Sequence, residues 1–260
     1  MKNYALGIDL GSASSKGILM ESGTTVETFE CPSGGDFKLT AEKMKEALLG
    51  KASLTLQDIT RTVATGYGAQ QVAFADEVKP EISCHGRGVF SLFPSVRTVI
   101  DVGDLYSRAF RIDDRGAVVH FVLSGKCAGG SARALTVIAK VLQIKVEEMG
   151  ELSLKSTRKV EFNTGCAVFA ESEAVSRIAE GVAKEDLLAG VHRALAAQIN
   201  SLAERLGIEG DLAVVGGGAR NPGLVKALQD LNPLEITVPP SPHMTAALGA
   251  AILAAGTVSP

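Results

Sequence analysis

The sequence predicts an α/β fold built from two related halves, and two strand–turn–strand segments carry this prediction. Residues 3–17 read as an apolar strand that ends in Asp9, a serine-rich turn and a second strand. Residues 97–112 repeat this plan, with Asp101 at the end of the apolar strand. Strands that alternate with amphipathic helical patterns indicate a layered α/β architecture. A repeated supersecondary unit indicates two similar halves that face each other across a cleft.

The helices expected in the first half follow from apolar spacing and from end signals. Residues 36–50 read as an amphipathic helix, with Thr40 as its N-cap and Gly50 as its C-cap. Residues 61–75 read as a strand, a glycine turn and the start of a helix. A further helix is expected over 85–95, with Pro94 as its stop signal.

The second half contains a long helical pattern at 187–207 and a strand–glycine turn–helix pattern at 211–232. In that pattern Asn221 is the expected N-cap and Pro222 the first helical residue. A small-residue helix ends the chain. We therefore expect a first subdomain of residues 1–96, on which the C-terminal helix 244–260 packs back, and a second subdomain of residues 97–243.

Composition excludes several classes of function. The net charge is −3, aromatic residues make up 5% and tryptophan is absent, which argues against a nucleic-acid-binding surface. No apolar run reaches the length that spans a bilayer, and the N-terminal strand does not read as a signal peptide. We expect a cytoplasmic protein, whose four cysteines are ligands, reactive thiols or core residues rather than disulfides.

The two aspartate hairpins have the chemistry of phosphate sites. Donors, a cation and a carboxylate stand within one hairpin, as a phosphate with its Mg²⁺ requires. The spacing is not that of a Walker A loop, and an ordinary hairpin with an acidic strand end is the plain alternative. The candidate residues are Asp9, Gly11, Ser12, Ser14, Ser15 and Lys16 in the first segment, and Asp101, Gly103 and Asp104 in the second. The glycine turn adds Gly216, Gly217 and Gly218, where a ring or a phosphate can lie against the backbone.

Two cysteines share a local pattern. Cys127 and Cys166 each follow a polar or glycine-rich stretch and precede a helical pattern. A helix N-terminus favours a thiolate, because free N–H groups and the helix dipole lie there. Two thiolates are half of a four-cysteine iron–sulfur site, whose other half a second subunit must supply. The plain alternative is two unrelated, partly buried core cysteines.

These landmarks, in this order, resemble the acetate and sugar kinase, heat-shock chaperone and actin superfamily. The more specific segments TGYGAQ, EISCHGRG, KCAGGSAR, CAVFAESEAVS and GVHRALA resemble the BadF/BadG/BcrA/BcrD family. That family includes activators of 2-hydroxyacyl-CoA dehydratases and ATPase subunits of benzoyl-CoA reductase. The resemblance implies two related subdomains around an ATP cleft.

The resemblance also implies cofactors and partners. It implies ATP/ADP with Mg²⁺, held through Asp9, with Lys16 on the phosphates and Asp101 supporting the metal or the attacking water. It implies a [4Fe-4S] cluster between two homologous subunits, as a homodimer or a heterodimer, with Cys127 and Cys166 as this chain's ligands. The implied electron donor is ferredoxin or flavodoxin, and the implied acceptor is an iron–sulfur reductase or dehydratase component. No nucleic acid or membrane is implied.

The sequence departs from the family pattern at the second phosphate segment. Dehydratase activators usually carry D-I-G-G-Q-D, whereas residues 101–106 read DVGDLY. This departure resembles the D-type subunit of benzoyl-CoA reductase, and it puts full ATP hydrolysis in question, because Asp104 can position water, bind Mg²⁺ or repel the γ-phosphate. A small-molecule kinase and a non-catalytic nucleotide-binding regulatory subunit remain as alternatives.

Overall fold

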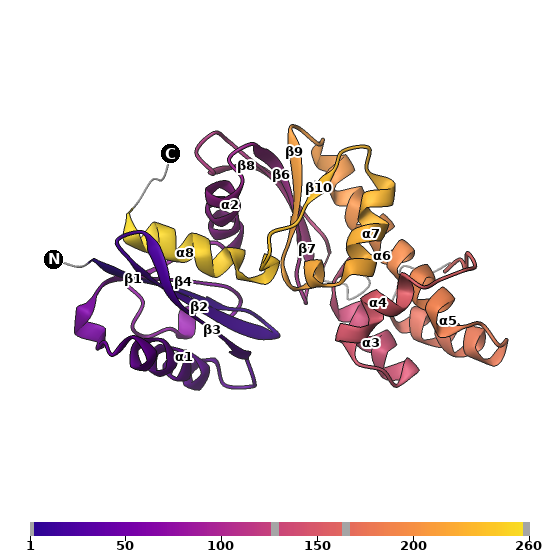
Figure 1. Ribbon diagram of the computed structural model, residues 1–260, viewed down its shortest axis with the longest axis horizontal. Helices are drawn as coiled ribbons and strands as arrows, with labels where there is room; N and C mark the ends of the chain where they lie inside the picture. Colours follow the sequence, from indigo (N-terminus) through magenta and orange to yellow (C-terminus); the bar gives the residue numbers. More distant parts are fainter. Residues whose placement is uncertain (1–2, 126–129, 163–166, 257–260) are drawn as a thin grey trace. The chain divides into compact units, whose positions relative to one another are not determined.

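The computed structural model describes residues 3–125, 130–162 and 167–256, and it divides the chain into two compact units. Unit 1 comprises residues 1–96, 112–119 and 244–260, and unit 2 comprises residues 97–111 and 120–243. Each unit contains one five-stranded sheet and its own hydrophobic core. Figure 1 shows the course of the chain through both.

Unit 1 is a sheet with helices on both faces. Its strands are β1 (Tyr4–Leu10), β2 (Ser14–Glu21), β3 (Thr24–Pro32), β4 (Ile59–Thr65) and β5 (Glu77–Val78), in the spatial order β3-β2-β1-β4-β5. Its helices are α1 (Phe37–Ala52), α2 (Glu81–Leu92) and α8 (Thr245–Ala255). Leu6, Ile8 and Leu10 of β1 share a core with α1, whereas Ala5 shares one with α8. The two faces of β1 therefore serve two different helices (Figure 1).

The core of unit 1 depends on close helix approach. Glycines at two places leave no room for a side chain: a Cβ on Gly7 would lie 2.3 Å from the Ala251 nitrogen, and one on Gly249 would lie 1.7 Å from the Cys84 carbonyl oxygen. The chain's last helix thus packs directly against its first strand and against α2. This packing is the one expected for the C-terminal helix.

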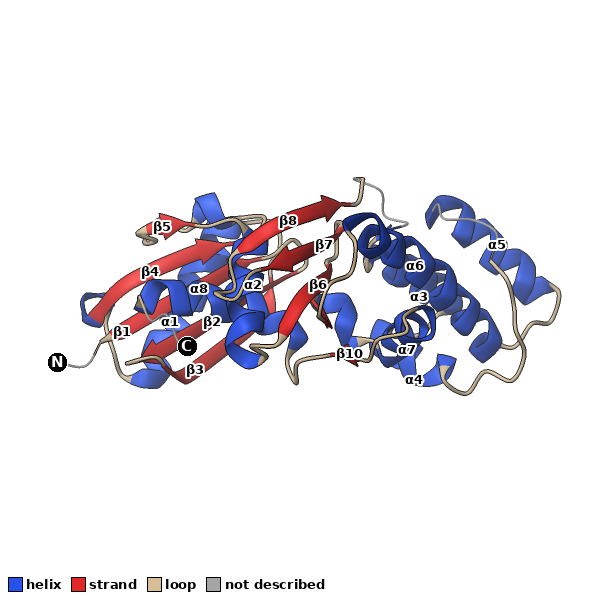
Figure 2. Cartoon of the chain, turned by 90° about the horizontal axis from the view of Figure 1, so that it is seen from above, coloured by secondary structure: helices blue, strands red, loops and turns tan. Residues whose placement is uncertain are grey.

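Unit 2 has the same strand order. Its sheet runs β10-β9-β6-β7-β8, from β6 (Val96–Val102), β7 (Ser107–Ile112), β8 (Val118–Leu123), β9 (Asp211–Val215) and β10 (Ile236–Thr237). Read from the other edge, this is the order of unit 1 with β6 in the place of β1. Figure 2 shows the strands of both sheets. The predicted pair of related halves, of the superfamily fold, is therefore confirmed.

Helices cover the core of unit 2 and extend beyond its sheet (Figure 2). They are α3 (Arg133–Leu142), α4 (Met149–Ser153), α5 (Ala167–Ala179), α6 (Lys184–Leu206) and α7 (Pro222–Leu231). Helix α6 packs against α4 and α7, and α3 packs against α5. The Asn221 side chain accepts a hydrogen bond from the Leu224 N–H, and Pro222 is the first residue of α7, as predicted.

The ends of α1 correct the sequence prediction. Asp36, not Thr40, is the N-cap, because its carboxylate accepts the Leu39 N–H at 3.0 Å. Thr40 lies one turn inside the helix and donates its hydroxyl to the Ser33 and Asp36 carbonyls. The helix continues past Gly50 to Ser53, which adopts the left-handed C-cap conformation. The helix expected to start near residue 69 is a single 3₁₀ turn, Ala69–Gln71.

Candidate phosphate-binding hairpins

The first hairpin places a carboxylate opposite a cation. Asp9 on β1 and Lys16 on β2 are direct cross-strand partners, and Lys16 Nζ lies 3.3 Å from Asp9 Oδ2. Both side chains are buried. Burial raises the pKa of Asp9, more than the Lys16 ammonium lowers it. Burial acts to lower the pKa of Lys16, but the Asp9 carboxylate outweighs it and the pKa is raised. The carboxylate therefore gains from a further cation.

The second oxygen of Asp9 fits a metal ion. Asp9 Oδ1 is buried and has no hydrogen-bond partner among the described residues. A buried carboxylate oxygen without a donor is costly, and an oxygen-loving cation such as Mg²⁺ removes that cost. Gly66, which follows β4 with φ +92°, lies against this oxygen, since a Cβ there would approach it to 2.3 Å.

The serines of the turn have different surroundings. Ser15 is buried, and its hydroxyl bonds the Ser33 hydroxyl at 2.7 Å, which in turn donates to the Gly11 carbonyl. The Ser15 side chain thus supports the turn from within. Ser12 and Ser14 are partly exposed, and the Ser14 carbonyl accepts a bond from Lys16 Nζ at 3.0 Å. Gly11 leaves room for that carbonyl, which a Cβ would meet at 2.5 Å.

The second hairpin repeats the first inside unit 2. Asp101 on β6 and Arg108 on β7 are direct cross-strand partners, with Arg108 Nε 3.0 Å from Asp101 Oδ2 and both side chains buried. Gly216 follows β9 with φ +85°, and a Cβ there would lie 2.3 Å from Asp101 Oδ1. In both units, therefore, a strand-end aspartate lies between an opposite cation and a glycine that follows the neighbouring strand.

Arg108 is a member of this arrangement that the sequence analysis did not select. The signal was present, because the spacing from aspartate to cation is the same in DLGSASSK and DVGDLYSR. Asp104, in contrast, forms an ion pair with Arg133 at 2.5 Å, at the start of α3. Hydrogen bonding to Asp104 raises the pKa of Arg133. Asp104 is therefore paired within unit 2.

The glycine turn after β9 is a backbone surface. Gly216 precedes the 3₁₀ turn Gly217–Arg220, and Val102 fills the position that a Cβ on Gly218 would take. A Cβ on Gly217 would meet nothing within 4 Å. Gly217 is thus the member of the trio with open space beside its backbone.

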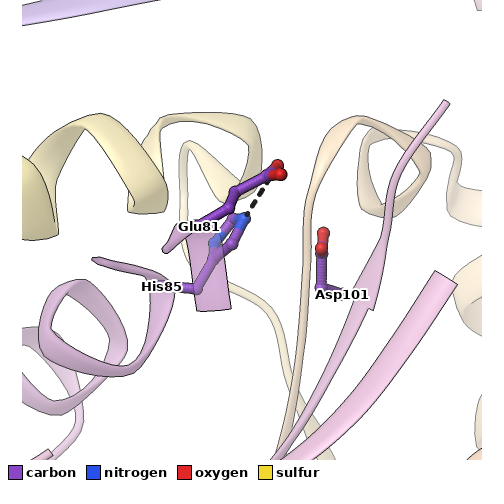
Figure 3. Close-up of side chains that lie close together, drawn as sticks. All are labelled: Glu81, His85 and Asp101. Atoms are coloured by element: carbon purple, nitrogen blue, oxygen red, sulfur yellow. Dashed lines mark ion pairs between the residues drawn. The ribbon is translucent and has the colours of Figure 1, made fainter. Parts of the chain in front are cut away.

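A glutamate–histidine pair on α2 lies near the first hairpin. In unit 1, His85 Nε2 lies 3.9 Å from Glu81 Oε1, and its Nδ1 is 2.7 Å from the Thr245 hydroxyl (Figure 3). Glu81 acts to raise the pKa of Asp9 and His85 acts to lower it. The Glu-x-x-x-His spacing in EISCHGRG was the available signal for this pair.

The candidate cluster ligands, Cys127 and Cys166, lie outside the described residues. The segments that follow them are described in part: α5 begins at Ala167, and α3, which follows Cys127 at a short interval, packs against α5. The other two cysteines are buried, and burial raises the pKa of Cys84 to about 12. A thiol of this kind is inert at neutral pH. Within the described residues, no helix is long and apolar enough to cross a bilayer.

Comparison with known proteins shows close relatives over nearly the whole chain. A model of the BadF/BadG/BcrA/BcrD ATPase family matches residues 6–254. The 2-hydroxyisocaproyl-CoA dehydratase activator of Clostridioides difficile is 39% identical over 96% of this chain and 94% of its own length. The D-type subunit of benzoyl-CoA reductase from Thauera aromatica is 31% identical, over 95% of this chain and 91% of its own length. The identity is thus higher to this dehydratase activator than to the reductase component.

Solved structures agree with the fold. An activator of 2-hydroxyisocaproyl-CoA dehydratase from Clostridium difficile, with bound ADPNP, superposes with a TM-score of 0.93 at 38% identity, covering 98% of this chain and 95% of that one. A ROK-family glucokinase from Streptomyces griseus has a TM-score of 0.61 at 12% identity, covering 98% of this chain and all of that one. This second likeness shows the fold alone.

Proposed function

We propose, from the premise that this chain belongs to the BadF/BadG/BcrA/BcrD ATPase family, that it is an ATP-hydrolysing activator that delivers electrons to a 2-hydroxyacyl-CoA dehydratase. The observation that carries the proposal is the pair of buried aspartate–cation hairpins, one in each unit. A dehydratase is favoured over a benzoyl-CoA reductase as acceptor by the identities of 39% and 31%.

The nucleotide part rests on residues whose contacts are described. Asp9 Oδ1 is the oxygen that fits Mg²⁺, directly or through water, and Lys16 is the cation available to a phosphate in the same hairpin. Asp101 supports the metal or the attacking water from the second hairpin. The glycine turn at 216–218 receives the adenosine. In such a site the protein acts mainly by positioning groups and stabilising charge. The relative with bound ADPNP supports this assignment.

The redox part rests on the two cysteines and on the family. A [4Fe-4S] cluster held by Cys127 and Cys166 of two copies, or of this chain and a homologous subunit, supplies a one-electron carrier. Support comes from the packing of α3 against α5, which brings the helices that follow the two cysteines together within unit 2. The proposed donor is a ferredoxin or flavodoxin, and the proposed acceptor is the iron–sulfur component of the dehydratase.

Anaerobic purification of the protein tests the redox part. We expect about four iron atoms per pair of chains, with broad absorption in the blue. Cys127→Ala and Cys166→Ala are each expected to lose the iron while retaining nucleotide binding. Cys84→Ala is the matched control, because the Cys84 thiol is buried and unreactive. Wild-type protein without iron, or cysteine variants that keep it, contradicts the shared cluster.

The two alternatives are distinguished by the same preparations. A kinase phosphorylates a small acceptor with ATP, but its support is a likeness in fold at 12% identity. A non-catalytic regulatory subunit is favoured by the Asp104–Arg133 ion pair at the altered phosphate segment, because a paired Asp104 is withdrawn from water and metal. Measured ATP hydrolysis by the wild-type protein excludes the regulatory alternative.

A further inference from the structure

The two hairpins match each other beyond their aspartates, and Arg108 is the member to which no role is assigned. Asp9 pairs with Lys16 and Asp101 pairs with Arg108, each across one antiparallel strand pair and each through the Oδ2 oxygen. The other oxygen of each aspartate lies against a glycine with a positive φ, at the same hypothetical Cβ distance of 2.3 Å. Arg108 therefore has in unit 2 the position that Lys16 has in unit 1.

A buried ion pair of this kind is not explained by stability. Desolvation of the two charges offsets most of their attraction, and apolar residues of similar size often serve a core equally well. The surrounding strands are otherwise apolar on this face: Ile100 and Val102 are fully buried, as is Ala109. A charged pair that occurs twice in the molecule, each time beside a glycine turn, indicates a polar ligand at both places.

The orientation of Arg108 is fixed by its neighbours. Its guanidinium carbon lies 4.8 Å from the centre of the Tyr106 ring, and its Nε faces Asp101. A guanidinium presents its donors as a planar fork, which matches the oxygens of a phosphate. Binding through Nε and stacking on a ring together hold that plane in one orientation.

From these contacts we propose that Arg108 is a second phosphate-contacting cation, which binds the terminal phosphoryl group of a nucleoside triphosphate. The proposal rests on the proposed ATPase function. The terminal group is assigned because Asp101, to which Arg108 is bound, is the residue placed beside the attacking water, and that water approaches the terminal phosphate. Charge develops on the oxygens of this group during transfer, where a fixed arginine acts most strongly.

The test compares Arg108→Gln and Arg108→Lys with wild-type protein. We expect kcat for ATP hydrolysis to fall about 10²-fold in Arg108→Gln, the usual effect of losing one donor at a developing charge. The affinity for ADPNP is expected to fall about tenfold, one charge-assisted hydrogen bond, while the affinity for ADP stays within about twofold. Arg108→Lys keeps the ion pair with Asp101 but loses the fork, and is expected to be intermediate in kcat with unchanged ADP affinity.

Arg111→Gln is the matched control, because Arg111 lies on the same strand and pairs with Glu209 instead. It is expected to hydrolyse ATP at the wild-type rate. Arg108→Gln leaves Asp101 buried without its cation, so Arg108→Lys decides the question if the glutamine variant does not fold. Unchanged hydrolysis in Arg108→Lys, or equal losses of ADP and ADPNP affinity in either variant, overturns the inference alone. Failure of wild-type protein to bind either nucleotide overturns the proposed function and the inference with it.

Discussion

At the scale of single residues, the glycines after β4 and β9 determine how closely the chain approaches the two aspartates. Gly216 has φ +85° and ψ 178°, a backbone conformation that is open almost only to glycine. Its neighbour Gly217 has an ordinary φ and open space around it. Two adjacent glycines of one turn therefore differ in what they permit.

This difference gives a prediction for a matched pair of variants. Gly216→Ala is expected to lower the free energy of unfolding by about 2–3 kcal/mol, because the Cβ is strained by the backbone and meets Asp101 Oδ1. Gly217→Ala is expected to change it by less than about 0.5 kcal/mol. Urea denaturation followed by circular dichroism measures both. Equal effects in the two variants contradict the steric account of the turn.

The residues that sequence reasoning found, and those it missed, differ in how local their signals are. Asp9, Asp101 and the glycine trio stand where strands end, and Asn221 and Pro222 carry their own end signals, so short stretches predicted them. Arg108 became visible only from the register, which places it opposite Asp101. Thr40 was a reasonable cap by residue type, but Asp36 one turn earlier satisfied the same backbone groups.

At the scale of elements, the contact of α6 with the start of α7 contains a histidine in an apolar setting. His192 of α6 is 1% exposed, and neither ring nitrogen has a hydrogen-bond partner among the described residues. A Cβ on Gly223 of α7 would lie 2.7 Å from His192 Nδ1. Burial lowers the pKa of His192 from 6.5 to about 4, and the nearby Arg193 charge acts in the same direction.

This depressed pKa predicts a pH dependence with a definite sign. Between pH 6.5 and about 4 the unfolded chain binds a proton at His192 that the folded chain does not, so stability falls as pH falls through this window. The expected loss from this group is about 3 kcal/mol between pH 7 and pH 4. Urea denaturation at several pH values measures it.

His192→Gln is expected to remove most of this loss, because glutamine does not titrate. His120→Gln is the control, since His120 is exposed on β8 and is expected to leave the pH dependence unchanged. The same acid slope in wild-type protein and in His192→Gln rules out His192 as its origin.

The sequence predicted the elements of the two halves unevenly for a physical reason. The hairpins β1–β2 and β6–β7 have buried apolar runs joined by glycine turns, which are strong local signals. The third strands, β3 and β8, were not predicted. Both lie away from the centre of their sheets, and their side chains are largely exposed, so their apolar spacing carries little information. Pairing with the preceding strand, rather than pattern, determines β3.

At the scale of the whole molecule, the chain repeats one sheet order twice, and its last helix returns to the first copy. Helix α8 supplies Ala246, Ala247 and Ala250 to the core that includes Ala5 of β1 and Val63 of β4. Unit 1 is therefore complete only when the end of the chain is folded onto its beginning. Small residues make this contact possible, since α8 approaches the backbone of both β1 and α2.

The last prediction follows from this arrangement and from the separate cores. Gly249→Ala is expected to lower the free energy of unfolding of unit 1 by about 3 kcal/mol, because its Cβ would lie 1.7 Å from the Cys84 carbonyl oxygen and α8 must move away from α2. Hydrogen exchange read by mass spectrometry is expected to show lost protection in β1, β4 and α2. The strands β6 and β9 and helix α6 are expected to keep theirs, since their core does not include α8.

Gly50→Ala provides the control for that experiment. Gly50 lies in α1 with nothing within 4 Å of its hypothetical Cβ, and alanine favours a helix over glycine by about 0.5–1 kcal/mol. This variant is therefore expected to be as stable as the wild-type protein or more so. If Gly249→Ala weakens protection equally in both units, the chain unfolds as one cooperative body, and α8 stabilises more than the core it joins.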